Sequence, residues 1–148
     1  MKEGSKFLVW ALFSLLLFAP CLKADGPVIV KVTVIQASNN GTDFNLDNDV
    51  YRDRLIQLFS YTSYQQIGQY SVNLEKGKQA VLATPDGYDL GLTLRGGEEG
   101  KTFIRVLIQK SGKKFLNTEL SLLGTSPVFL GGPPVDSGDL LLVIETLS

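Results

Sequence analysis

Alternating apolar and polar side chains recur along most of the chain and predict β-strands. In Val28–Gln36, VIVKVTVIQ, four valines occupy alternate positions, and the positions between them mix apolar and polar residues. Because neighbouring strand residues point to opposite faces, this stretch predicts a strand with one wholly apolar face. Shorter segments of the same kind follow at Gln69–Leu74, Gln79–Ala83, Leu90–Leu94, Lys101–Gln109, Lys114–Leu123 and Leu140–Leu147.

Turn-forming residues separate these segments. Pro85–Gly87 and Ser111–Gly112 have the composition of tight turns, the second of a two-residue hairpin. Glu75–Lys78, EKGK, predicts a hairpin between the strands on either side. Gly131–Asp139, GGPPVDSGD, has two interpretations. We favour a connector, because Gly and Pro are common in loops, over a bare backbone that a ligand approaches closely.

The period of the pattern changes once, and this change predicts a helix. From about Asp49 to Ser60, apolar residues recur at helical spacing and form one stripe of Tyr51, Leu55, Leu58 and Phe59. Strands spaced roughly 8–12 residues apart are typical of sandwiches. We therefore predict an α+β fold that is predominantly antiparallel β, as a sandwich or strongly bent sheet, with one amphipathic helix near residues 49–60.

The first residues do not fit this pattern and predict a signal peptide. Lys2 and Lys6 precede an apolar run of thirteen residues, Phe7–Ala19. The run is shorter than the roughly 20 residues that span a membrane, and its order of charged, apolar and small residues is typical of export. We predict a signal peptide at 1–24 and a single β-rich domain at 25–148.

The site of cleavage has three interpretations. Cleavage after Cys21 and cleavage after Ala24 each fit the expected pattern of small residues in part. The third interpretation is a lipid anchor on Cys21, although Pro20 stands where a small residue is expected before a lipidated cysteine. Removing residues 1–24 from a chain with 14 basic and 15 acidic residues leaves 11 and 14, a net charge of −3. No basic block is present, so we expect no nucleic-acid partner.

The residue types that the chain lacks exclude several catalytic mechanisms and metal sites. The chain has no histidine, and its single cysteine lies in the predicted signal segment. A Ser-His-Asp triad, a thiolate nucleophile and a cysteine-type zinc site are therefore excluded for the mature chain. We expect no catalytic residues and no cofactor. The alternative is a small hydrolase that uses carboxylates alone, for which the adjacent Glu98 and Glu99 are poor candidates because strand neighbours face opposite ways.

One acidic stretch suggests calcium, but its spacing argues against a site. Asp43, Asn45 and Asp47 recur at every second position, as at the start of a calcium loop. The twelfth position, where a bidentate glutamate is needed, is Arg54. Short polar residues just before a helix are typical of N-terminal caps. We therefore expect no metal and assign the stretch Asp47–Asp49 to capping.

Aromatic residues gather after the predicted helix. Tyr61 and Tyr64 are the candidate binding residues, because tyrosine offers an apolar face and a polar tip to a glycan or peptide. The alternative, which we favour, is that the aromatic residues pack the helix against the sheet.

Three segments of the sequence are similar to a known group of proteins. VKVTVIQASN, LFSYTSYQQI and FLNTELSLLGTSPVFLGGPPVDSGDLLLVIETL resemble parts of short exported proteins from several bacterial lineages, a group without an established activity. The resemblance covers most of the mature chain. It implies an exported, β-rich bacterial domain and assigns no functional residue.

Together these features predict a non-enzymatic binding or assembly module. Its place would be the periplasm or the extracellular space. Its partner would be another envelope or extracellular protein or a glycan, with no transmembrane segment in the mature chain.

Overall fold

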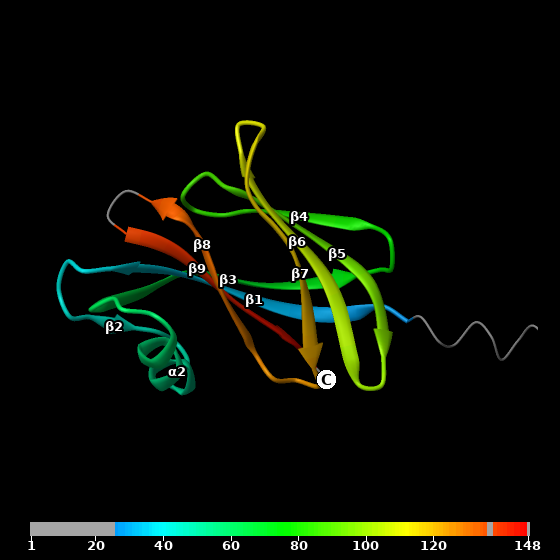
Figure 1. Cartoon of the computed structure of the whole chain (residues 1–148), viewed down its shortest axis with the longest axis horizontal. Coiled ribbons are helices and arrows are strands. Elements are labelled where there is room, and N and C mark those ends of the chain that lie inside the picture. The colour runs from blue at the N-terminus through cyan, green and yellow to red at the C-terminus, as the bar shows by residue number, and fades with distance from the viewer. Residues whose placement is uncertain (1–25, 136–137, 148) are drawn as a thin grey trace, which may run out of the picture.

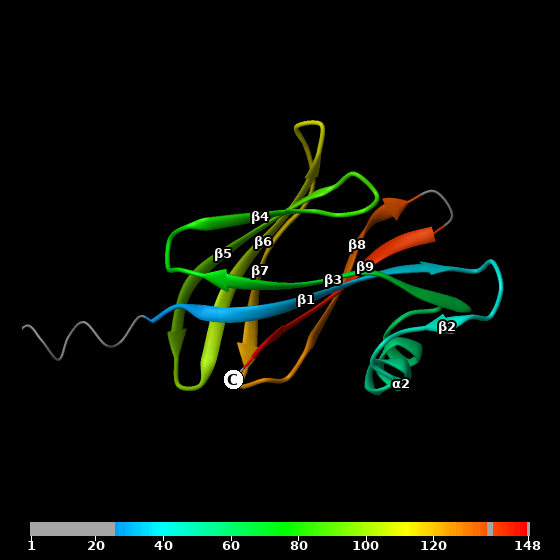
Figure 2. The same cartoon turned by 180° about the vertical axis from the view of Figure 1, so that it is seen from behind.

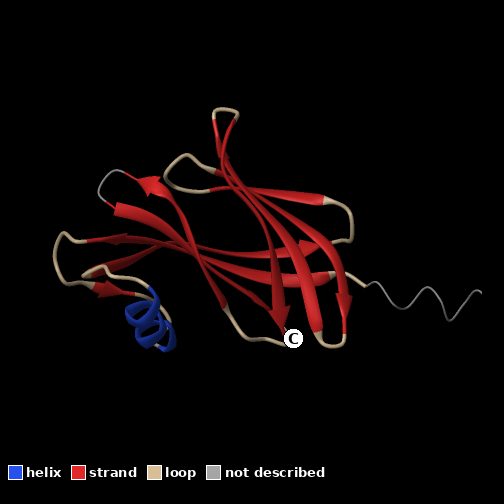
Figure 3. Cartoon of the chain, viewed as in Figure 1, coloured by secondary structure: helices blue, strands red, loops and turns tan. Residues whose placement is uncertain are grey.

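The computed structural model describes residues 26–135 and 138–147, and its strands form two sheets (Figure 1). Among these residues the backbone is almost entirely strand and turn, with one short helix (Figure 3). The predicted signal segment 1–24 and the residues Asp136 and Ser137 lie outside the described residues. The α+β class with predominantly antiparallel strands is confirmed.

The larger sheet has five strands in the order β2-β3-β1-β9-β8. Its pairs are antiparallel except for the short parallel pair of β2 with β3. The strand bounds are β1 Val28–Ser38, β2 Phe44–Asn45, β3 Ser63–Leu74, β8 Val128–Val135 and β9 Gly138–Thr146.

The smaller sheet has four antiparallel strands in sequence order, β4-β5-β6-β7. A two-residue turn joins β6 to β7. Both Ser111 and Gly112 have positive φ, 52° and 79°, as a primed hairpin turn requires, so the predicted hairpin is confirmed. The bounds are β4 Gln79–Ala83, β5 Asp89–Glu98, β6 Lys101–Lys110 and β7 Lys113–Leu123.

The main core lies between the two sheets, which cross each other in both views (Figure 1, Figure 2). The valine face of β1 points into it, so the alternation in the sequence identified the inner face correctly. Fully burying each such side chain contributes about 1.5–3 kcal/mol. The buried members are Val30, Val32, Val34, Val72, Leu74, Tyr88, Leu90, Leu92, Leu94, Ile104, Val106, Ile108, Leu122, Leu140, Leu142 and Ile144.

A second core lies on the outer face of the larger sheet, beneath helix α2 (Val50–Leu58). In both views the helix lies at one end of this sheet, away from the four-stranded sheet (Figure 1, Figure 2). Tyr51 and Leu55 are its buried residues. They pack against the other parity of the central strands, Ile35, Ala37, Leu141 and Val143.

The predicted helical stripe is wrong at Leu58. Leu58 is 47% exposed, and Phe59 is only partly buried and already extended, with φ −130° and ψ 157°. The helix ends as the Phe59 N–H bonds to the Leu55 carbonyl at 2.9 Å. Leu58 therefore does not share the buried face of Leu55, whereas Phe59, just past the helix, still packs against the second core.

Two predicted connections are also wrong. Glu75–Lys78 does make a turn, with the Lys78 N–H bonded to the Glu75 carbonyl at 3.1 Å, but β3 and β4 are in different sheets and do not form a hairpin. Most of the predicted connector Gly131–Asp139 is strand. Gly131–Val135 belongs to β8, an edge strand with a register shift before Pro134. Proline is tolerated there because an edge strand pairs on one side only.

Candidate functional site

Of the two candidate binding residues, the structure buries one completely. The side chain of Tyr64 is 0% exposed and belongs to the second core, and its hydroxyl donates to the Leu55 carbonyl at 3.3 Å. Burial raises the pKa of Tyr64. Tyr61 is partly buried and meets Tyr64 edge to face, with 6.3 Å between ring centroids. Packing of the helix end against the sheet accounts for both positions.

The acidic stretch before the helix has structural partners. Phe44–Asn45 pairs with β3, the Asp47 carboxylate accepts from the Gln66 amide at 2.8 Å, and the Asn48 side chain accepts from the Val50 N–H at 3.0 Å. Capping therefore comes from Asn48, whereas Asp49, the residue at the helix start, makes no side-chain cap. Within residues 26–135 and 138–147, no group of three or more acidic, histidine or cysteine side chains gathers as a metal site would.

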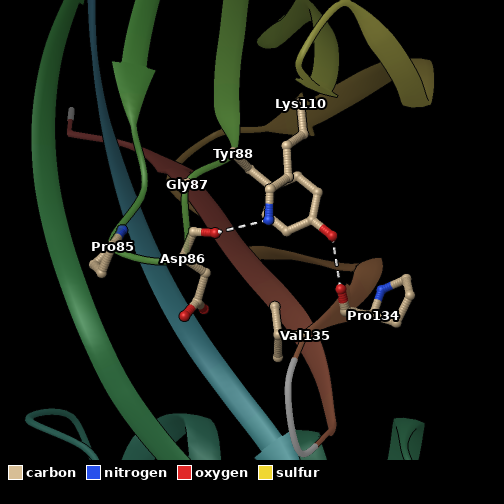
Figure 4. A pocket seen from close by; sticks show the side chains of 7 residues that line it. All are labelled: Pro85, Asp86, Gly87, Tyr88, Lys110, Pro134 and Val135. Atoms are coloured by element: carbon tan, nitrogen blue, oxygen red, sulfur yellow. Dashed lines mark hydrogen bonds between the residues drawn. The ribbon is translucent and has the colours of Figure 1, made fainter.

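One cleft lies at an end of the sandwich, where parts of both sheets meet (Figure 4). Its volume is about 570 Å³. It is bordered by the turn before β5, the end of β6 and the end of β8. The lining residues are Pro85, Asp86, Gly87, Tyr88, Lys110, Pro134 and Val135.

A compact turn forms one wall of the cleft. The Thr84 N–H donates to the Tyr88 carbonyl at 2.8 Å, and the Thr84 hydroxyl accepts from the Tyr88 N–H at 3.2 Å. Gly87 takes the left-handed conformation, φ +86°, that the predicted PDG turn needs. These bonds hold the turn in one conformation and direct the Tyr88 ring toward the opposite sheet.

Tyr88 links the two sheets across the cleft. Its hydroxyl donates to the Pro134 carbonyl at 2.7 Å, as the dashed line in Figure 4 marks. The Phe115 ring packs edge-on against it, with 5.3 Å between centroids. The Lys110 ammonium lies 5.0 Å from the Tyr88 ring centroid, a cation–π distance. The walls are therefore joined by directional contacts rather than by apolar packing alone.

The described polar groups of the cleft include the Lys110 ammonium, the Asp86 carboxylate and backbone carbonyls. The Lys110 ammonium donates to the Asp86 backbone carbonyl at 3.5 Å, a long bond. The Asp86 carboxylate, the only one among the described lining residues, points away from Lys110 (Figure 4). A carboxylate mechanism needs a second acid or base close by. The cleft instead presents the Lys110 ammonium as a donor and backbone carbonyls as acceptors to a ligand.

The adjacent carboxylates lie elsewhere. Glu98 ends β5, Glu99 follows in the turn with φ 51°, and both are exposed. They border a second groove of about 610 Å³ at the opposite end, next to Ile29 and Leu147. Neither groove brings two buried carboxylates together among the described residues.

Sequence reasoning missed Tyr88, Lys110 and Pro134 as a group. Tyr88 and Pro134 are 46 residues apart, and the segment with Pro134 was expected to be a connector. The turn PDG and the hairpin beside Lys110 were recognisable, but nothing in the local pattern places one beside the other. Their proximity follows from the packing of the two sheets.

Comparisons of the chain with models of protein families, with curated proteins and with solved structures found no match. In the described part of the chain, no helix has the length and apolar character to cross a membrane.

Proposed function

We propose that the chain is an exported binding or assembly module of the bacterial cell envelope or extracellular space, without catalytic activity of its own. The cleft beside Tyr88 carries the proposal. A site of this kind binds through a preformed shape and a few placed polar groups. Its walls are fixed by the Tyr88–Pro134 bond, and its charged donor is Lys110.

The export part of the proposal is supported by the charged and apolar order of the first residues and by the resemblance to short exported bacterial proteins. The partner we propose is a glycan or another envelope protein. Both present carbonyl, carboxylate or hydroxyl oxygens that an ammonium group can bind.

Amide chemical-shift titration tests the cleft. Neutral and acidic oligosaccharides and extended peptides are added to the ¹⁵N-labelled protein. We expect saturable shifts at Gly87, Lys110 and Val135, and weaker binding for Lys110→Met. The matched control is Lys101→Met, which removes an exposed lysine from the groove at the opposite end.

Two results would contradict the proposal. One is the absence of shifts at the cleft with every probe. The other is turnover of an oligosaccharide or peptide that Asp86→Asn abolishes, because this would favour the carboxylate-dependent hydrolase.

A further inference from the structure

The outer face of the four-stranded sheet carries a second, smaller hollow. Its volume is about 240 Å³, and an acidic residue, Glu119, lies opposite Arg105 on β7 and lines an adjoining hollow. We call it the Gly91 hollow and define it by Gln79, Gly91, Thr93, Arg95, Arg105 and Lys114. It lies on the face opposite the main core and does not overlap the residues of the cleft.

Gly91 gives the hollow a floor without a side chain. Gly91 lies opposite Val81 on β4 and Leu107 on β6, so it stands in the middle of the sheet face. A Cβ added to Gly91 would overlap the side-chain nitrogen of Gln79, which reaches over the glycine. The floor is therefore backbone, and an amide donor lies directly above it.

Cationic groups surround this floor. Arg105 lies opposite Thr93, and Arg95 follows Thr93 two residues along the same strand face. Directly opposite residues have Cβ atoms about 5 Å apart, and diagonal neighbours about 7–8 Å. The two guanidinium groups can therefore reach one small group, while Lys114, opposite Gln109 on β6, is a more distant cation at the edge of the hollow. This concentration of positive charge contrasts with the net charge of −3 of residues 25–148.

The arginine side chains are only partly engaged within the described residues. Arg105 donates through Nε to the Asn117 side-chain oxygen at 3.0 Å, which orients the guanidinium and leaves its terminal nitrogens for a ligand. Arg95 Nε is 4.0 Å from a Glu119 carboxylate oxygen at the rim, and both side chains are more than half exposed. Such an exposed pair contributes little and is easily exchanged for a better acceptor.

We propose that the Gly91 hollow binds the oxyanion group of an acidic glycan, that is, a carboxylate, sulfate or phosphate. Guanidinium forks match these groups through paired hydrogen bonds. The hydroxyl of Thr93 and the amides of Gln79 and Asn117 provide partners for neighbouring sugar hydroxyls. This site is separate from the cleft beside Tyr88, and its failure would leave the proposed function untouched.

Calorimetric titration with trigalacturonate tests the proposal, with the neutral galactotriose as the matched probe and inorganic sulfate and phosphate as separate arms. We expect trigalacturonate to bind, galactotriose not to bind, and the affinity to fall with rising salt because the site is exposed. Arg105→Gln should weaken binding about tenfold, the loss of one charge-assisted hydrogen bond.

Gly91→Val distinguishes binding inside the hollow from non-specific electrostatic attraction of the anionic glycan, because it fills the floor of the hollow without changing the charge. We expect it to weaken binding at least as much as Arg105→Gln. Gly91→Ala is the milder version, and a thermal melt verifies that each variant is folded. Arg54→Gln, an exposed arginine on α2, is the charge-matched control and should leave the affinity within about twofold, as expected for a distant surface site.

Three outcomes would overturn the inference. These are no binding of trigalacturonate at low salt, equal losses from Arg54→Gln and Arg105→Gln, or unchanged affinity in folded Gly91→Val and Gly91→Ala. Binding of sulfate or phosphate without trigalacturonate would also overturn the glycan assignment.

Discussion

At Tyr51 the helix, the sheet and a polar cluster of the outer face meet. The residue is 2% exposed, and its ring packs edge-on against Phe129 with 5.7 Å between centroids. Its hydroxyl donates to a Glu145 carboxylate oxygen at 2.7 Å, and the Lys31 ammonium lies 3.4 Å from the same oxygen. Burial first, and the bond to Glu145 second, raise the pKa of Tyr51 to about 12.

This shift makes stability depend on pH in a defined direction. The folded state holds the Tyr51 proton more tightly than the unfolded chain, where the pKa is about 10. The contribution is therefore complete below about pH 10 and is lost as the pH rises toward 12.

Tyr51→Phe should remove both the hydrogen bond and this pH dependence. At pH 8 we expect a loss of about 1–2 kcal/mol, because the Glu145 carboxylate loses a donor. Between pH 10 and 12 the variant should lose less stability than the parent. Urea unfolding across this range measures the difference. Tyr61→Phe is the control, since no hydrogen bond of its hydroxyl is described, and equal profiles for parent and Tyr51→Phe would contradict the assignment.

At the scale of the element, helix α2 can be tested through two leucines three residues apart. Leu55 is 0% exposed and Leu58 is 47% exposed. Leu55→Ala should therefore cost about 2–5 kcal/mol, whereas Leu58→Ala should cost within about 0.5 kcal/mol. Denaturant unfolding of both variants compares them directly. Similar losses would mean that the helix packs through a wider face than the described one.

The start of strand β9 is constrained by close backbone contact. A Cβ on Gly138 would overlap the carbonyl oxygen of Ala37 in β1. Strand β1 is paired on both sides, so it cannot move aside. Gly138→Ala should therefore destabilise the fold by about 2 kcal/mol or more. Gly26→Ala, where a Cβ meets open space, is the control, and a stable Gly138→Ala protein would contradict this packing.

The elements show what the sequence could predict and what it could not. Alternation identified the inner face of β1 and the bounds of β4, because side-chain direction in a strand is a local property. Alternation could not predict that Glu75–Lys78 connects two different sheets, because the pairing of a strand depends on strands that are distant in the sequence. For the same reason Pro134 was assigned to a connector, although it forms an edge strand and accepts the Tyr88 bond.

At the scale of the whole molecule, the main core joins strands from the start of the described chain to its end. Strand β1 begins at Val28, and its valine face is buried between the two sheets. Among the described residues, the members of the two cores lie within residues 28–144. The cleavage that we predict near Ala24 would remove none of these residues.

We predict that the exported protein begins within a few residues of Ala24, because the charged start and the short apolar run are typical of a processing signal. Intact mass and N-terminal sequencing of the protein recovered from the periplasm and the medium of a bacterial host measure this. A chain that starts at Cys21 with the added mass of a diacylglycerol group would establish the lipid anchor instead. A soluble exported chain that still begins at Met1 would contradict processing, and the signal-peptide assignment would then be wrong.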